Sequence, residues 1–400
     1  MKVLFLTSVG HPQVRLEAEY LGRETDLTLT YVVVPTLNRK TFLHALKCFI
    51  KHLPQVSLAL IKVRVPLLPQ VLYYSLLLGI ILEDRKVNRK KYDLIYAHWL
   101  YPAGFLGLML SKIWKCKVIS VIWGYDIQVV HEAKDYGVRG TNRIISRFVI
   151  EKSDLVIANH KVHKVLAQRI STSKAHNKIL YISPGIPDIS LIVQEDLTIE
   201  LKERLRSIPD KLEESKIVLY APSLRPLYGI REFVRAAQIV SNSVKDCIFI
   251  IVGDGELKEE VVRFIRENKL EDRVVLMGKV GHESMRVLYK LSTLVCDLAY
   301  PGTGTTTLEA LCFGKPVIGI RSPKSIIEHG KNGFLIEKGD YKSLANYIMA
   351  IVKDPGLRKS LSINARRTFV ERFNIERRVI KLLKIFKLLM NNKPGPHSHE

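Results

Sequence analysis

The residues best suited to chemistry lie at positions 300–320, in the run Tyr-Pro-Gly-Thr-Gly-Thr-Thr-Thr-Leu-Glu-Ala-Leu-Cys-Phe-Gly-Lys-Pro-Val-Ile-Gly-Ile. Residues that permit close backbone approach or helix capping open the run: Gly302, Thr303, Gly304, Thr305 and Thr306. The free N–H groups at the start of the following helix form a site for an anion such as a diphosphate. Glu309 lies about one turn further along, near the place of a ribose attached to that diphosphate. The alternative is an ordinary strand–turn–helix unit that exposes one glutamate.

Predicted strands and helices alternate along the whole chain and position this run. The helix is expected to end at Gly314, because Pro316 cannot continue it, and a buried strand follows. Short runs of Val, Ile and Leu predict strands at 2–7, 28–34, 93–97, 117–122, 154–158, 179–183, 216–221, 247–252, 273–277, 293–298 and 316–320. Helix-length segments separate many of them. This order predicts an α/β fold with two Rossmann-like, doubly wound domains.

The boundary between the two domains is predicted near residues 184–215. The segment Ser-Pro-Gly-Ile-Pro-Asp at 183–188 cannot continue a helix or a central strand, and a polar stretch follows it. The predicted parts of the chain are a first domain at 1–188, a second domain at 189–375, a basic amphipathic helix at 376–392 and a disordered tail at 393–400. The apolar stripe of the helix is expected to pack on the protein, with anionic lipid as the alternative. Arg378 and its basic neighbours are expected to lie largely away from that stripe.

Composition limits the kind of protein this can be. The chain has 400 residues, of which 47% are apolar, so it can build real cores and is not disordered. The formal net charge of +23 and the pI of about 9.7 favour an acidic partner, which is nucleic acid, an anionic membrane surface or a phosphorylated substrate. Five scattered cysteines without metal-site spacing are typical of reduced cysteines in a cytoplasmic protein.

Two features of the chain concern membranes. The longest apolar run, Val71–Leu82, is too short to cross a bilayer, because a helical span needs about 20 residues. Residues 39–91 are rich in basic and apolar residues, which favours contact with a membrane or a lipid substrate over packing alone. Residues 1–9 have the pattern of a buried strand rather than of a secretory signal. We therefore expect a cytoplasmic protein with peripheral contact at the cytoplasmic face of an anionic membrane.

The order of motifs in the second half resembles glycosyltransferase family 4, whose members are retaining enzymes of the GT-B fold that use nucleotide-sugar donors. The matching segments are IVGDGEL, VVLMGKVGHESM, TTTLEALCFGKPVIG and IIEHGKNGFLIEKGD within residues 216–375, with a weaker match at 93–126. The resemblance implies two Rossmann-like domains with an interdomain cleft, in which the second domain binds the donor and the first binds the acceptor. It also implies that the last helix returns to the first domain.

Carried over residue by residue, the resemblance assigns a donor site to the second domain. Glu309 matches the second glutamate of the family's pair, which is expected to hold the ribose hydroxyls. The position of the first glutamate is occupied by Pro301, which has neither a carboxylate nor a backbone N–H. Sugar contacts at this place then depend on the backbone of Gly302, Thr303 and Gly304.

A second part of the donor site is expected in the loop that follows strand 216–221. Ser223 stands in the family's usual arginine position and Tyr228 in its usual lysine position, so both offer hydroxyls instead of charge. Arg225 is our candidate for the positive charge at the leaving diphosphate, because its planar guanidinium donates two parallel hydrogen bonds. The alternative is an arginine exposed on a loop without a ligand. Lys315 and Lys324 are nearby alternatives to Arg225 for this charge.

In the first domain, the resemblance places His98 near the reacting sugar, with a hydrogen-bonded structural histidine as the alternative. Trp123 stands where family members often have histidine. Asp126 is expected either to contact an acceptor hydroxyl or to cap a turn. Gly10 and Gly253 lie in loops after strands, where glycine lets a backbone come close to a ligand.

Together with the resemblance, these residues predict a glycosyltransferase of the hexosyltransferase type, and the resemblance alone implies that it is a retaining enzyme. It would move a sugar from a nucleoside-diphosphate sugar to a hydroxyl of a lipid-linked or membrane-associated glycan. No Asp-x-Asp in a suitable loop is present, so the interpretation requires neither a metal nor any cofactor besides the nucleotide sugar as co-substrate. The alternatives are a nucleotide-sugar epimerase of the same fold and a basic nucleic-acid-binding protein. The sequence shows no helix-turn-helix, RNA-recognition or zinc motif, so nucleic acid is not an expected partner.

Overall fold

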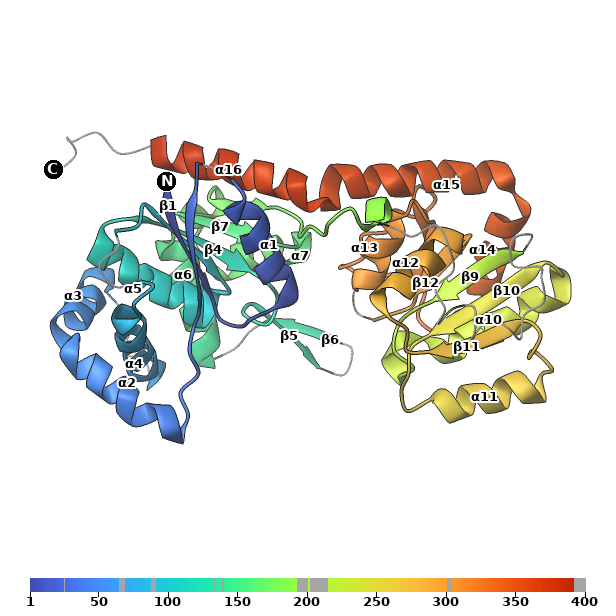
Figure 1. The fold of residues 1–400 in the computed structure, drawn as a ribbon, viewed down its shortest axis with the longest axis horizontal. Coiled ribbons are helices and arrows are strands. Elements are labelled where there is room, and N and C mark those ends of the chain that lie inside the picture. The colour runs from blue at the N-terminus through green and yellow to red at the C-terminus, as the bar shows by residue number, and fades with distance from the viewer. Residues whose placement is uncertain are drawn as a thin grey trace. The chain divides into compact units, whose positions relative to one another are not determined.

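Two parallel sheets, one in each of two units, organise the chain (Figure 1). The structure is a computed structural model that describes residues 1–24, 26–64, 69–87, 91–131, 134–137, 140–192, 201, 215–300 and 304–391. Unit 1 consists of Met1–Gly185 and Ile375–Glu400, and unit 2 of Ile186–Asn374. We predicted the division after residue 188 and the returning helix from residue 376. The predicted tail at 393–400 lies outside the described residues.

The sheet of unit 1 has the strand order β2-β1-β3-β4-β7-β8, and all of its pairings are parallel. Its strands are β1 (Lys2–Thr7), β2 (Thr28–Val33), β3 (Leu94–His98), β4 (Lys117–Ile122), β7 (Leu155–Ala158) and β8 (Ile179–Tyr181). A separate antiparallel hairpin consists of β5 (Gln128–His131) and β6 (Lys134–Gly137), which the sequence analysis missed.

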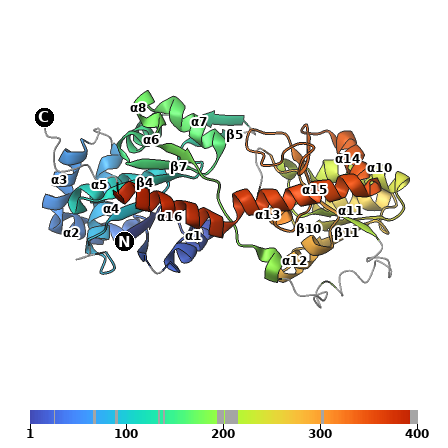
Figure 2. The same cartoon turned by 90° about the horizontal axis from the view of Figure 1, so that it is seen from above.

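Helices cover both faces of this sheet (Figure 2). The helices of unit 1 are α1 (Pro12–Gly22), α2 (Arg39–Lys51), α3 (Leu53–Val63), α4 (Pro69–Glu83), α5 (Phe105–Trp114), α6 (Gly140–Lys152), α7 (Lys161–Ile170), α8 (Ser173–His176) and α16 (Ile375–Asn391). Helices α1 and α16 share one core with the strand residues Val3, Phe5 and Tyr96. Helices α3 to α7 share the other core with the alternate strand residues, among them Leu4 and Leu6. The buried stripe of α16 therefore packs on the protein.

The sheet of unit 2 has the order β11-β10-β9-β12-β13-β14 and is also parallel. Its strands are β9 (Lys216–Tyr220), β10 (Cys247–Val252), β11 (Val274–Gly278), β12 (Leu294–Asp297), β13 (Val317–Ile320) and β14 (Gly333–Ile336). Its helices are α10 (Ile230–Ser243), α11 (Lys258–Glu267), α12 (His282–Leu291), α13 (Thr305–Cys312), α14 (Tyr341–Lys353) and α15 (Pro355–Thr368). Helices α10, α11 and α14 cover one face, and α12, α13 and α15 cover the other.

Strand order gives each unit a topological switch point, where open parallel sheets bind ligands. In unit 2 the chain runs from β9 to β10 and β11 on one side, and then returns to β12 on the other side of β9. In unit 1 the same reversal separates β1 from β3. In open parallel sheets, ligands bind outside the carboxyl ends of the strands at this reversal. The loops after β1 and β3, and those after β9 and β12, are therefore the places to look.

Candidate functional site

The loops after β9 and β12 meet at the switch point of unit 2. The Tyr300 backbone N–H donates to the Leu227 carbonyl over 3.1 Å. Gly229 has a φ of +71°, and a Cβ added there would lie 2.6 Å from the Leu298 Cβ. A residue with a side chain at this position would therefore push the two loops apart. Gly229 therefore sets the spacing between the two loops at this edge.

The loop after β9 presents Arg225 to solvent, which agrees with both predicted alternatives, a cation for an anionic ligand and an exposed loop arginine. Ser223 is exposed as well, and Tyr228 is half-buried. The buried Tyr220 supports the loop from the sheet, because its hydroxyl donates to the Tyr228 carbonyl over 2.9 Å. The Tyr228 N–H donates to the Arg225 carbonyl over 3.0 Å and closes a short turn. An exposed guanidinium on a supported loop at the carboxyl edge is available to a phosphate.

Gly253 lets two loops of the protein pack together. It has a φ of +127°, and a Cβ there would lie 2.9 Å from the Pro222 carbonyl oxygen. A Cβ at Gly255 would lie 2.4 Å from the Leu224 carbonyl oxygen. The Leu224 N–H donates to the Asp254 carbonyl over 3.2 Å across the same contact. We expected the glycine at 253 to admit a ligand, whereas the close approach seen here is between the turn after β10 and the loop after β9.

The start of α13 is held by Asp297, a residue that the sequence analysis missed. Asp297 ends β12 and is buried, and its Oδ2 accepts from Thr307 Oγ1 at 2.6 Å and from the Gly304 N–H at 3.4 Å. Burial raises the pKa of this carboxyl, and the hydrogen bonds oppose the rise. Gly304 is the N-cap, and Thr305 and Thr306 are the first helical residues, so the predicted capping role of these threonines is wrong. The available signal was an aspartate that ends a buried strand.

Glu309 is held in place by the neighbouring helix α12. The hydroxyl of the buried Tyr289 donates to Glu309 Oε2 over 2.9 Å. Burial raises the pKa of the Glu309 carboxyl, while the Tyr289 hydrogen bond and the charges of His282 and Arg286 lower it. The result is a half-buried, oriented carboxylate about one turn into α13.

Lys315 lies at the opposite edge of the sheet from this site. It lines a pocket of about 390 Å³ with residues that precede β9 and β12, among them Ser215 and Thr293. Its Nζ donates to the Lys290 carbonyl over 2.8 Å, and burial lowers the pKa of Lys315 to about 8. Lys315 is therefore at the amino edge, and the suggestion that it replaces Arg225 at the diphosphate is wrong. Lys324 follows β13 at the carboxyl edge and stays an alternative.

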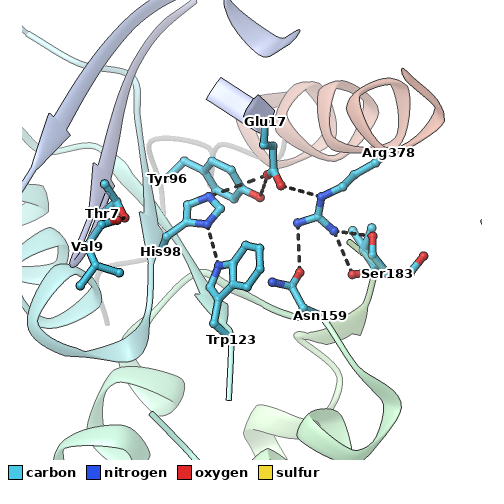
Figure 3. Close-up of polar contacts among 10 residues, drawn as sticks. Thr7, Val9, Glu17, Tyr96, His98, Trp123, Asn159, Ser183 and Arg378 are labelled. Carbon is cyan, nitrogen blue, oxygen red and sulfur yellow. Dashed lines mark hydrogen bonds and ion pairs between the residues drawn. The ribbon is translucent and has the colours of Figure 1, made fainter. Parts of the chain in front are cut away.

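In unit 1, a buried polar network lies below the switch point (Figure 3). Arg378 of α16 donates through Nε to Glu17 Oε2 over 2.7 Å. Glu17 Oε1 accepts from the Tyr96 hydroxyl at 2.6 Å and lies 3.7 Å from His98 Nε2. His98 Nδ1 accepts from the Trp123 indole N–H at 2.8 Å. A chain of contacts thus runs from the last helix to the loop after β4.

Arg378 also fixes the carboxyl ends of β7 and β8. Its guanidinium donates to the carbonyls of Ile182 and Ser183 over 2.9 and 2.7 Å, and to Asn159 Oδ1 over 3.0 Å (Figure 3). The prediction that Arg378 lies away from the apolar stripe of its helix is wrong, because it is buried beside Val379. Four hydrogen-bonding groups in the protein replace the water that this charge would otherwise bind.

His98 is fully buried, and its ring stacks on Phe5 with the ring centroids 4.5 Å apart. Burial lowers the pKa of His98 to about 3 against the opposing effect of Glu17, so the imidazole is neutral at physiological pH. A ring enclosed in this way does not reach a sugar, which corrects the expectation that His98 faces the reacting centre. What His98 does contact is the Trp123 indole, and it sets the orientation of that ring.

Aromatic rings gather at the carboxyl ends of β1, β3 and β4. Trp99 and Trp123 are stacked with their centroids 5.5 Å apart. The His11 ring lies 6.3 Å from Trp99 and 5.6 Å from Trp123. Trp99 has a φ of +72°, a conformation that costs about 1–3 kcal/mol and is concentrated at functional sites. The sequence signal for this cluster was the two tryptophans directly after two predicted strands.

Asp126 closes the loop after β4. It is buried, Oδ2 accepts from the Leu100 N–H at 3.0 Å, and Oδ1 accepts from the Gly124 N–H at 2.8 Å. Burial raises the pKa of Asp126 to about 6. Of the two predicted roles, this geometry corresponds to the turn cap and not to an acceptor contact. The space beside Gly10 is open, since an added Cβ would meet nothing within 4 Å.

Three residues of the predicted donor site, Pro301, Gly302 and Thr303, lie outside the described residues. Within the part of the chain that the structure describes, no group of three or more His, Cys, Asp and Glu side chains could hold a metal ion.

Comparison with known proteins defines the class. Residues 202–368 match the family Glycosyl transferases group 1. Over 314 residues, the chain is 26% identical to N-acetyl-alpha-D-glucosaminyl L-malate synthase of Bacillus anthracis, with 77% of this chain and 78% of the synthase covered. Over 314 residues it is 24% identical to UDP-Gal:alpha-D-GlcNAc-diphosphoundecaprenol alpha-1,3-galactosyltransferase of Escherichia coli, with 77% and 78% covered.

A solved structure with the same fold is that of Anabaena HepE in complex with UDP. It has a TM-score of 0.68 at 19% identity, and 97% of this chain and 100% of HepE are covered. Two parallel sheets with helices on both faces, together with these similarities, make the protein a glycosyltransferase of the GT-B fold. More narrowly, it is similar to family 4 of these enzymes, which confirms the predicted family resemblance and fold class.

Proposed function

We propose that the protein moves a sugar, with retention at the anomeric carbon, from a nucleoside-diphosphate sugar to an acceptor hydroxyl. The observation that carries the proposal is that the exposed Arg225 and the oriented carboxylate of Glu309 come from the two loop regions that meet at one switch point. Similar proteins support it: HepE is seen in complex with UDP, and the name of the E. coli relative specifies UDP-Gal. The donor base and the sugar are not specified by these residues.

In the proposed donor complex, each group of unit 2 has its own task. The Glu309 carboxylate accepts hydrogen bonds from the ribose hydroxyls. Arg225 and the N–H groups at the start of α13 stabilise the charge that develops on the leaving diphosphate. Ser223 and Tyr228 supply hydroxyls beside Arg225, and Gly302, Thr303 and Gly304 supply backbone contacts to the sugar. No residue in this scheme requires a metal ion.

We propose that the acceptor binds to unit 1, beside the stacked Trp99 and Trp123. Aromatic rings offer a flat apolar surface with a polar edge, which suits the face of a sugar ring. In this scheme, His98 is a positioning residue, since its Nδ1 holds the Trp123 indole at 2.8 Å. The E. coli relative is named for a diphosphoundecaprenol acceptor, which supports a lipid-linked or membrane-associated glycan as the acceptor here. The proposed location is the cytoplasm, with peripheral contact at the membrane.

A thermal-shift panel of UDP, GDP, ADP, dTDP and their sugars tests the donor site. A ligand that binds only the folded state raises the melting temperature, and a concentration 100-fold above Kd adds about 2.7 kcal/mol of stability. We expect one base to produce a large shift. If no nucleotide shifts the melting temperature at millimolar concentration, the proposal is wrong. Conversion of the donor sugar without acceptor would indicate an epimerase, and salt-sensitive binding of oligonucleotides without nucleotide binding would indicate a nucleic-acid-binding protein.

Arg225→Ala is expected to weaken binding of the nucleoside diphosphate by about 1.5–3 kcal/mol, the usual contribution of a hydrogen bond to a charged group. Binding of the unphosphorylated nucleoside should not change, because Arg225 is assigned to the diphosphate. Calorimetric titration of both ligands measures the difference. Arg263→Ala, which removes an exposed arginine of α11, is the matched control. An equal loss for the nucleoside and the diphosphate would remove Arg225 from the phosphate site.

A further inference from the structure

An exposed apolar and basic surface covers helices α2, α3 and α4, which lie together at one end of unit 1 (Figures 1 and 2). Among the residues that the structure describes, 21 large apolar side chains are exposed, and nine of them are Phe42, Leu43, Leu46, Ile50, Leu53, Leu58, Ile61, Leu72 and Tyr73. The same segment carries Arg39, Lys40, Lys47, Lys51, Lys62 and Arg64. We call these fifteen residues the α2–α4 face. Its apolar side chains are too many and too close together to be the scattered exposure that is normal on protein surfaces.

Helix α2 packs on α4 with one side and leaves apolar side chains exposed on the other. Ala45 and Cys48 are buried, and the backbone of α2 lies directly against α4. A Cβ on Gly79 would lie 2.7 Å from the Phe49 nitrogen, so only glycine permits this approach. Leu43 and Ile50 are spaced by two helical turns on the side away from that contact and are 68% and 61% exposed.

The charge of the segment shows which kind of partner suits it. From Leu27 to Leu82 the chain has no aspartate or glutamate, although the whole chain has 39. Of the six basic residues of the α2–α4 face, Lys51 pairs with Glu83 at the end of α4, its Nζ 2.7 Å from Oε1. The other five are not balanced by acidic residues of the same segment. Lys40 and Lys47 are spaced by seven residues on α2, so they flank its apolar side together. Lysines and arginines near an anionic lipid surface are attracted to its phosphates and strengthen binding.

We propose that the α2–α4 face docks on an anionic lipid bilayer. Its apolar side chains enter the boundary between headgroups and acyl chains, and its lysines and arginines contact lipid phosphates. None of the helices in the described ranges is long and apolar enough to cross a membrane, so the contact lies in the plane of the surface. A second copy of the chain is a poorer occupant, because a symmetric contact would bring the basic residues of both copies together.

The proposed docking surface continues into the acceptor region, so it deepens the proposed function and rests on it for the identity of the acceptor. Tyr74 of α4 packs on Phe105 with their ring centroids 5.0 Å apart. Gln70 of the same helix donates to Thr141 Oγ1 over 2.6 Å. Burial, and then the proximity of Asp126 and Tyr74, raises the pKa of Tyr101 to about 12. Helix α4 therefore adjoins the loop that follows Trp99. A glycan attached to a lipid in the bilayer would then lie beside the proposed acceptor region.

Pelleting of the full chain with sucrose-loaded vesicles tests the proposal. The vesicles contain phosphatidylglycerol mixed with phosphatidylcholine, or phosphatidylcholine alone. One variant replaces three strongly exposed apolar residues of α2 and α3, Leu43→Ser, Ile50→Ser and Ile61→Ser, and its control is Ile363→Ser with Leu388→Ser. A second variant is Lys40→Glu with Lys47→Glu, and its control is Lys353→Glu with Lys359→Glu. All of these side chains are exposed, so circular dichroism should show an unchanged fold.

We expect the wild-type chain to bind the anionic vesicles and each face variant to lower the partition coefficient at least tenfold, while the controls bind like the wild type. Added salt should weaken binding of the wild type and have less effect on the Lys40→Glu, Lys47→Glu variant. The proposal is overturned if the wild type does not pellet with anionic vesicles or if the face variants pellet equally well. It is also overturned if the wild type is a dimer that the serine variant dissociates, without any vesicle binding. Vesicle binding needs no donor, so it can succeed even where the nucleotide thermal-shift panel fails.

Discussion

Glu309→Gln is expected to lower kcat/KM for sugar transfer about 100-fold, which corresponds to about 2.7 kcal/mol of lost transition-state stabilisation. The reason is the loss of an ionised acceptor, since hydrogen bonds to a carboxylate are roughly twice as strong as those to a neutral amide. A hydrogen bond of 2.9 Å from the Tyr289 hydroxyl to Oε2 fixes the orientation of this carboxylate. Steady-state kinetics with the donor identified by thermal shift measures the effect, and calorimetry shows whether donor binding falls with it.

Two controls separate the charge of Glu309 from its position. Tyr289→Phe removes only the hydrogen bond that orients the carboxylate and should cost less than Glu309→Gln. Glu283→Gln changes an exposed glutamate on α12 and should cost nothing. Turnover of Glu309→Gln at the wild-type rate would exclude this residue from the donor site.

The pH dependence gives an independent test of Glu309. Burial raises the pKa of this carboxyl, against the Tyr289 hydrogen bond. Protonation then removes the acceptor at a higher pH than for an exposed glutamate, so kcat/KM should fall as the pH drops through this raised pKa. The fall should be absent in the Glu309→Gln variant, which carries no titrating group at this position.

Much of the fold could be predicted because parallel strands buried on both faces are continuous apolar runs. Cys247–Val252 is buried at all six positions, and the matching run in the sequence has no polar interruption. All of the strands predicted from such runs are present, with ends that differ by no more than two residues. Gly333–Ile336 was missed because it is short and contains a glycine at its start. Helix bounds within 39–91 were not predicted, since mixed apolar and basic residues there give no clear period.

The polar network of unit 1 could not be predicted, because it joins residues that are 361 positions apart. Each partner does leave a local signal. Glu17 lies on the buried side of α1 with Val14, Ala18 and Leu21, and a lone carboxylate in such a stripe requires a buried partner. Arg378 leaves the same signal on α16. Arg378 was placed with its basic neighbours away from the apolar stripe, and Glu17 was not singled out. The expectation of an accessible His98 came instead from the family resemblance.

Arg378→Met is expected to destabilise unit 1 by about 3–5 kcal/mol, because it leaves the Glu17 carboxylate buried without its cation. The three tryptophans of the chain, Trp99, Trp114 and Trp123, all belong to unit 1. Tryptophan fluorescence during urea unfolding therefore follows this unit alone. Lys381→Met, one turn further along α16 and exposed, is the matched control and should change stability little.

The sign of the pH dependence identifies the cause of this loss. Burial alone would raise the pKa of Glu17, but the charge of Arg378 holds it below its ordinary value in the wild type. Glu17 thus stabilises the folded wild type above its unfolded pKa, and this contribution is lost as the pH falls through the lowered pKa. Without Arg378, burial raises the pKa instead, so the variant loses stability as the pH rises through it. The variant should therefore be less destabilised at about pH 5 than at about pH 7. Adding Glu17→Gln to Arg378→Met should recover part of the lost stability at the higher pH. If Arg378→Met loses the same stability at both pH values, packing and not charge explains the effect.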